Sequence, residues 1–172
     1  MSDRLFGTDG VVNLDTPEMT RGLPNVHVPI SSPGIVYKHF VIVGSHVQEG
    51  NGPGGSGDVR AFNLHDGTLA WTFHSIPQKG EPNYGTWVGN AAEKRSGVNV
   101  WGFFTVDVQR GIVYIPLGNA SGDLWGGDRP GNNLYSSSLV AADANTGKYL
   151  WHFQLVHHDI WDYDLESPPA LV

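Results

Sequence analysis

The stretches AFNLHDGTLAW (residues 61–71) and AADANTGKYLW (residues 141–151) align without a gap. Both begin with alanine, have Asn or Asp at the third position, contain a turn dipeptide that ends in glycine, and finish on tryptophan. Alternating residues on either side of an Asp-Gly or Thr-Gly turn are typical of a β-hairpin. The sequence therefore predicts a repeated hairpin whose second strand ends at Trp71 in one copy and at Trp151 in the other.

The spacing of the two copies predicts how many repeats the chain contains. The tryptophans are 80 residues apart, about twice the ~40 residues of a propeller blade. Either a blade without the motif lies between them, or one blade carries a long insertion. Residues 74–97 are rich in Pro, Gly and polar side chains, so a loop insertion is expected there.

Other β-rich segments support an all-β fold class. Strands are expected within 34–45, 99–108, 111–118 and 137–143, where β-branched and aromatic residues gather. A Gln-Arg-Gly turn between the second and the third of these predicts another hairpin. Sustained apolar spacing of the helical kind is missing from the sequence. The strand–turn–strand rhythm favours a β-propeller over a sandwich.

Length and composition limit the remaining possibilities. With 172 residues and only two complete repeats, residues 1–172 are expected to form part of a larger propeller domain. The formal charge of −7 argues against a nucleic-acid partner, because phosphates require Lys and Arg. The absence of cysteine excludes disulfides and thiolate metal sites. The sequence contains no apolar run as long as a membrane helix, and its first ten residues lack a secretion signal.

The repeat resembles the tryptophan-docking motif of the dehydrogenases that depend on pyrroloquinoline quinone (PQQ), and the resemblance covers nearly the whole chain. It extends through residues 6–14, 55–77 and 97–172. The membrane glucose dehydrogenase-like branch is the most similar. The resemblance implies an eight-bladed propeller, of which this chain holds early blades. It also implies PQQ on the propeller axis, a divalent cation, usually Ca²⁺, beside PQQ, and a catalytic aspartate above it.

The resemblance places the catalytic aspartate at Asp159, within VHHDIWDYD (residues 156–164). A carboxylate within reach of a substrate hydroxyl can accept its proton while a hydride leaves the carbon. A lone aspartate more often caps a turn, but the surrounding string favours the catalytic interpretation here. Asp162 and Asp164 are expected to be solvated or structural.

Two histidines are assigned near the cofactor. His158 follows His157, and neighbours on a strand face opposite ways, so the two are not expected to share a zinc ion. One of the pair is expected near the active site, and we assign His158. His27, in NVHVPISSP, resembles a histidine that lines the site in the glucose branch. A structural role is the alternative for each.

Glu49 and Asn119 match the acidic and amide calcium ligands of the related alcohol dehydrogenases. Both offer the hard oxygen atoms that Ca²⁺ prefers. The alternatives are a loop carboxylate in a glycine-rich turn and an ordinary Gly-Asn turn. The glucose branch often carries an Asp-Asn pair in the earlier loop, where this chain has Glu49-Gly50. The metal site is therefore expected to follow the alcohol-dehydrogenase pattern.

Trp101 lies 18 positions before Asn119, the spacing of the tryptophan that stacks on PQQ in the alcohol dehydrogenases. Indole offers the largest aromatic face for a flat tricyclic quinone. An ordinary core tryptophan is the alternative.

Taken together, the resemblance implies a periplasmic enzyme that oxidises a sugar, polyol or alcohol and passes electrons to ubiquinone or a cytochrome. Two other interpretations remain open at this point. One is a noncatalytic propeller scaffold that binds protein partners, because a fold alone does not give a function. The other is a nonfunctional piece or degenerate relative. The joint presence of Asp159, Asn119, Trp101 and Glu49 favours the enzyme.

Overall fold

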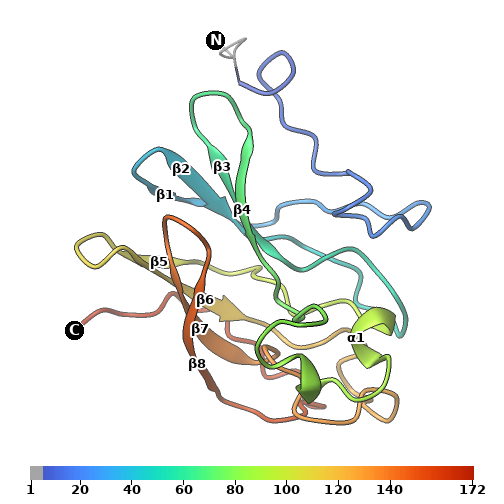
Figure 1. The fold of residues 1–172 in the computed structure, drawn as a ribbon. Helices are drawn as coiled ribbons and strands as arrows, with labels where there is room; N and C mark the ends of the chain where they lie inside the picture. The colour runs from blue at the N-terminus through green and yellow to red at the C-terminus, as the bar shows by residue number, and fades with distance from the viewer. Residues whose placement is uncertain (1–5) are drawn as a thin grey trace.

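The computed structural model describes residues 6–172 and contains two four-stranded antiparallel sheets (Figure 1). Residues 1–5, part of the segment inspected for a secretion signal, lie outside the described residues. The first sheet consists of β1 (Ile35–Tyr37), β2 (Phe40–Val43), β3 (Val59–Asn63) and β4 (Leu69–Phe73). The second consists of β5 (Thr105–Asp107), β6 (Ile112–Leu117), β7 (Ser138–Asp143) and β8 (Tyr149–Gln154). In each sheet the strands are ordered as in the sequence, which is the arrangement of a propeller blade.

The repeated hairpins predicted from the sequence are confirmed as β3–β4 and β7–β8. Ala61 pairs with Trp71, and Ala141 pairs with Trp151. In both hairpins the register shifts immediately after the alanine. The two copies therefore share the same bulge as well as the same turn, because equivalent sequences impose equivalent local geometry.

The turn glycine of the second hairpin serves the contact between the two blades. Gly147 has φ +70°, a conformation that favours glycine, and a Cβ atom there would lie 2.5 Å from the Trp71 ring. Trp71 is consequently buried, with 7% of its surface exposed, whereas 43% of Trp151 is exposed. The same residue type is thus covered where a following blade is present and uncovered at the end of the second blade.

Other strand boundaries differ from the prediction. The segment 34–45 forms two strands rather than one, because Lys38 adopts a left-handed turn (φ +52°) between β1 and β2. The hairpin at the Gln-Arg-Gly turn is confirmed as β5–β6. The two blades are consecutive, and a long connection, residues 74–104, joins β4 to β5. It contains a 3₁₀ turn, η1 (Tyr84–Thr86), and a short helix, α1 (Ala91–Lys94), where the sequence predicts the insertion.

The core lies between the blades and continues into this connection. Strand residues such as Val59 and Val113 are completely buried beside Val98 and Trp87 of the connection. Burial of an aliphatic or aromatic side chain of this size contributes about 1.5–3 kcal/mol relative to exposure. The apolar residues of the connection therefore fix its path across the end of both sheets.

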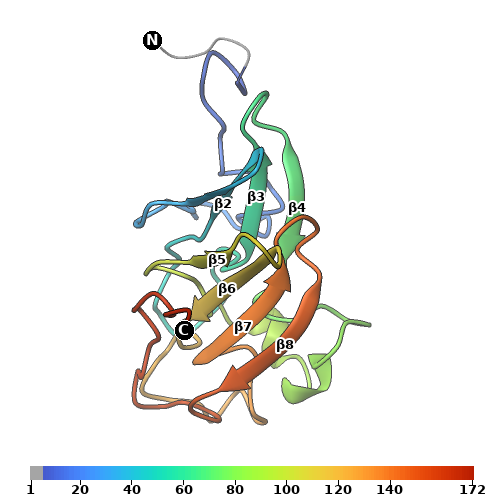
Figure 2. The same ribbon diagram turned by 90° about the vertical axis from the view of Figure 1, so that its left-hand side faces the viewer.

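The connections separate into two groups (Figures 1 and 2). The short hairpin turns lie at one end of the sheets, and the long connections after β2, β4, β6 and β8 lie at the other. This follows from the topology, because in a meander every second strand ends at the same edge. The segments that carry most of the predicted site residues therefore meet at one end. Within residues 6–172, no helix is long and apolar enough to cross a membrane.

Candidate functional site

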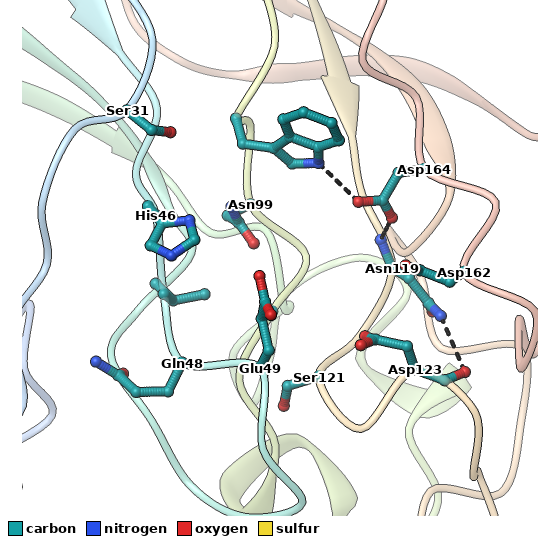
Figure 3. A pocket seen from close by; sticks show the side chains of 13 residues that line it. Ser31, His46, Gln48, Glu49, Asn99, Asn119, Ser121, Asp123, Asp162 and Asp164 are labelled. Atoms are coloured by element: carbon teal, nitrogen blue, oxygen red, sulfur yellow. Dashed lines mark hydrogen bonds between the residues drawn. The ribbon is translucent and has the colours of Figure 1, made fainter.

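A cavity of about 410 Å³ opens where these long connections meet (Figure 3). It is lined by five segments: Ser31 before β1, residues after β2, residues before β5, residues after β6, and residues after β8. Three of the predicted site residues, Glu49, Trp101 and Asn119, line it together. Asp162 and Asp164 line it as well.

Trp101 is held at the cavity by one hydrogen bond from its side chain. Its indole Nε1–H donates to Asp164 Oδ2 at 2.6 Å, and 38% of the residue is exposed. The Trp101 main-chain carbonyl accepts a hydrogen bond from the Ser32 hydroxyl. The indole is therefore tethered at its only polar atom while much of its surface stays free for contact.

Asn119 is buried and its side chain is already hydrogen-bonded. Its Oδ1 accepts from the Ala120 backbone N–H at 2.7 Å and from the Ser136 hydroxyl at 3.2 Å. Its Nδ2 donates to the Asp123 carbonyl at 3.4 Å. The Ala120 N–H fixes which end of the amide is oxygen. Because both bonds engage that oxygen, ligation of a cation by Asn119 stays a prediction.

The cavity collects negative charge. Glu49, Asp123, Asp162 and Asp164 all line it, and within residues 6–172 no Lys or Arg does so. Burial, together with the charges of Asp162, Asp164 and Glu49, raises the pKa of Asp123 to about 6. Partial burial and the neighbouring charges of Asp164, Asp159 and Glu49 raise the pKa of Asp162. A bound cation would relieve this repulsion.

The donor chemistry fits a hard divalent cation such as Ca²⁺, because the acidic side chains and the Asn119 amide all offer oxygen. Their geometry does not by itself complete a site. In the part of the chain that the structure describes, no three His, Cys, Asp or Glu side chains stand close enough together to hold a metal ion. Amide, main-chain or cofactor oxygens would therefore have to supply part of the coordination.

Asp159 lies outside the set of residues that line the cavity and is completely buried. Its Oδ2 accepts from the Ser137 hydroxyl at 2.7 Å and from the Tyr163 N–H at 3.0 Å. Its Oδ1 accepts from the Trp161 N–H at 2.9 Å. The Asp159 carboxylate thus ties together the backbone of the loop that presents Asp162.

Neither predicted histidine reaches the cavity. His158 has φ +48°, and its Nδ1 lies 2.9 Å from the Gly131 carbonyl. The side chain of His27 is largely exposed, and its Nδ1 lies 2.6 Å from Asp15 Oδ2. That hydrogen bond, followed by one from the Val28 N–H, lowers the pKa of Asp15. His27 instead lines a shallower depression of about 280 Å³ that shares Glu49 with the main cavity.

Four titratable residues that line the cavity were not assigned to it from the sequence: His46, Asp123, Asp162 and Asp164. For Asp162 and Asp164 the sequence offers only their spacing of two residues, which would place both side chains on one side of a regular strand. Asp162 has φ +63°, so this segment is not a regular strand and the spacing does not fix the side-chain directions. For His46 and Asp123 the sequence offers no comparable signal.

Comparison with known proteins then decides the family. The family model described as the β-propeller domain of PQQ-dependent glucose, ethanol and alcohol dehydrogenases matches residues 2–172. The chain belongs to this quinoprotein family. Both the all-β class and the propeller architecture predicted from the sequence are confirmed.

Among its curated quinoprotein relatives are the quinate/shikimate dehydrogenase (quinone) of Acinetobacter baylyi and the quinoprotein glucose dehydrogenase of Escherichia coli. The chain is 36% identical to the first over 97% of its own length, and 36% identical to the second over 96%. It spans 20% of the length of each of these two relatives.

A solved quinohemoprotein alcohol dehydrogenase from Pseudomonas putida HK5 superposes on this quinoprotein chain with a TM-score of 0.72. The sequence identity is 29%, and the match covers 85% of this chain and 23% of the other. The agreement extends the family assignment to the three-dimensional arrangement of the two blades.

Proposed function

We propose that this chain contributes the Trp101 side of a PQQ site in a dehydrogenase that oxidises a sugar, polyol or alcohol. The observation that carries the proposal is the convergence of Glu49, Trp101, Asn119 and Asp162 on one cavity from four separate connections. The relatives act, by their names, on glucose, quinate or alcohols. The chain's own residues do not distinguish among these substrates.

PQQ, when bound, supplies the two-electron acceptor that protein side chains lack. Trp101 would provide an aromatic surface for it, since the indole is tethered at one edge and partly exposed. Glu49 and Asn119 would help to hold Ca²⁺, with the release of the Ser136 hydrogen bond freeing a lone pair on the Asn119 oxygen.

We assign the proton acceptor to Asp162 in preference to Asp159. The Asp159 carboxylate is sealed away from solvent and accepts three hydrogen bonds, which stabilise it as a structural group. Asp162 borders the cavity, and its raised pKa makes it a better proton acceptor than an ordinary carboxylate. Asp159 then acts by shaping the loop. The earlier assignment of the base to Asp159 stays a prediction that the same experiment decides.

Electron transfer out of the site and the cellular location are part of the same proposal. Ubiquinone or a cytochrome would accept the electrons, and the periplasm would be the compartment. The support is the membership of the quinoprotein family and the quinone acceptor named for the Acinetobacter baylyi relative.

The test uses the protein at its natural full length, supplied with PQQ and Ca²⁺, and measures reduction of an artificial electron acceptor with aldoses, quinate and simple alcohols. Turnover is expected with at least one of these substrates. Asp162→Asn should lower kcat by about 100-fold or more, the usual contribution of a positioned base, while PQQ binding is retained.

Asp159→Asn is the paired variant. It should lower thermal stability, and kcat per folded molecule should fall less than in Asp162→Asn. If Asp162→Asn kept full turnover and Asp159→Asn lost it while folded, the base would be Asp159. If the wild-type protein neither binds PQQ nor oxidises any of these substrates, the dehydrogenase proposal is wrong and the noncatalytic scaffold that binds protein partners is the remaining function.

A further inference from the structure

One carboxylate connects two of the segments that build the cavity. Asp164 Oδ2 accepts the Trp101 indole N–H at 2.6 Å, and Asp164 Oδ1 accepts the Asn119 backbone N–H at 2.5 Å. Figure 3 shows both hydrogen bonds meeting at the single carboxylate. Trp101 precedes β5, Asn119 follows β6, and Asp164 follows β8, so three separate parts of the second blade are joined there.

Two glycines allow the segment that carries Asp164 to come this close. A Cβ atom at Gly118 would lie 2.9 Å from each Asp164 carboxylate oxygen. A Cβ atom at Gly102 would lie 2.0 Å from the main-chain oxygen of Glu166. These glycines are the neighbours of Asn119 and Trp101 in the sequence. The position of Asp164 therefore depends on the close packing of its segment against the segments that carry Asn119 and Trp101.

The bond to the indole has consequences for the ring. Indole has a single polar hydrogen, so one hydrogen bond uses its entire polar capacity. A hydrogen bond to an ionised acceptor is about twice as strong as one between neutral groups. Trp101 is 38% exposed and, together with Asp162 and Asp164, lines both the main cavity and a wider opening of about 610 Å³ beside it. Without the tether, a ring so exposed could rotate away from either space.

We infer that Asp164 is a positioning residue that orients the Trp101 indole for the flat cofactor and fixes the Asn119 backbone at the same time. The inference rests on the proposed function, since it assumes that Trp101 contacts PQQ. It assigns different roles to the two aspartates that reach the cavity from the segment after β8. Asp162 faces the cavity as proton acceptor, whereas both oxygens of Asp164 are engaged by donors from the protein.

The test is a double-mutant cycle in the full-length protein, with Asp164→Asn, Trp101→Phe and the two combined. Asparagine preserves the shape and can keep the bond from the Asn119 N–H through its remaining oxygen. Its amide nitrogen would then face the indole N–H, donor against donor. Phenylalanine keeps an aromatic surface but has no N–H.

The first readout is the dissociation constant of PQQ, measured by equilibrium dialysis with Ca²⁺ present. Asp164→Asn alone should weaken PQQ binding by about 10-fold, and in the Trp101→Phe background the same change should cost less than 2-fold, because residues in direct contact are not additive. Glu93→Gln, an acid-to-amide change at an exposed side chain of α1 that lines neither the cavity nor the wider opening, is the matched control and should leave binding unchanged.

The second readout needs no cofactor. The near-ultraviolet circular dichroism of the metal-free, PQQ-free protein should change with Asp164→Asn, and that difference should disappear in the Trp101→Phe background. If Asp164→Asn has the same effect in the wild-type and Trp101→Phe backgrounds, in either readout, the inference is wrong. Asp164 would then contact the cation or the substrate instead of orienting Trp101. If the wild-type protein does not bind PQQ, both the proposed function and this inference are wrong. If it binds PQQ but the effects of Asp164→Asn and Trp101→Phe on the dissociation constant are additive, only the inference is wrong.

Discussion

The carboxylates at the hairpin turns and the carboxylates at the cavity are the same chemical group in opposite surroundings. At the turns, Asp66 accepts from the Thr68 hydroxyl and N–H, which lowers its pKa. Hydrogen bonds from the Arg110 guanidinium and N–H lower the pKa of Asp107 in the same way. At the cavity, burial and like charges instead raise the pKa values of Asp123 and Asp162.

The direction of the pKa shift separates acids that stabilise the fold from acids that are available to bind a ligand. A turn supplies its own donors, so the charge is satisfied inside the protein as soon as the turn forms. The cavity brings four carboxylates together without a Lys or Arg side chain among its lining in residues 6–172. Carboxyl groups with raised pKa values in a concave site are typical of functional sites, because the compensating charge comes from outside.

The largest effect is expected from a change to Glu49, the cavity acid that is predicted to hold the cation. Glu49→Gln should raise the Ca²⁺ concentration required for half-maximal PQQ-dependent turnover by about 100-fold, because a neutral amide replaces a charged oxygen donor. Calcium titration after chelator treatment measures this. Asp66→Asn, the equivalent change at a turn, should leave the calcium requirement unaltered. Equal requirements in Glu49→Gln and wild type would show that Glu49 is not a ligand.

Stability against pH should also separate the two groups of acids. The pKa of Asp123 is raised in the folded protein, so the protonated form is favoured by folding, and its contribution to stability is lost as the pH rises from about 4 through about 6. Asp123→Asn should therefore stabilise the metal-free protein at pH 7 by about 1 kcal/mol, after allowance for partial exposure. Thermal melts at pH 4.5 and pH 7 measure this, and saturating Ca²⁺ should abolish the gain. A variant less stable than wild type at pH 7 without Ca²⁺ would refute the repulsion.

The smallest expected effect belongs to the turn. The pKa of Asp66 is lowered in the folded protein, so its contribution to stability is present above its ordinary pKa of 3.8 and disappears as the pH falls below that value. Asp66→Ala should lower the melting temperature at pH 7 by at most about 1 °C. The difference from wild type should vanish in melts at pH 2 to 3. A rise in melting temperature at pH 7 would contradict the assignment of Asp66 as a structural acid.

Local chemistry explains which predictions from the sequence were confirmed. The hairpins ending at Trp71 and Trp151 depend on short-range alternation and a glycine turn, both visible in a single sequence. The resemblance to quinoprotein dehydrogenases added Glu49, Trp101 and Asn119, and the structure brings these three to one cavity. Their roles in binding PQQ and Ca²⁺ stay predictions.

The loop after β8 shows why other residues could not be placed from the sequence. His158 and Asp162 both have left-handed backbone conformations, with φ +48° and +63°. Such residues interrupt the simple alternation of an extended strand, so the direction of each side chain no longer follows from its position. Because the alternation is interrupted, the Asp159 side chain is buried and hydrogen-bonded within its own loop, whereas Asp162 lines the cavity.

The all-β class and the repeated hairpin follow from the amino-acid sequence, because they depend on turn residues and strand patterns that act over a few positions. The quinoprotein family follows from sequence similarity along residues 2–172. Which acids share a cavity, which one tethers Trp101 and which one is enclosed by its own loop became visible only in the folded chain. These outcomes depend on segments that are far apart in the sequence and meet only when the two blades pack together, so short-range sequence patterns do not encode them.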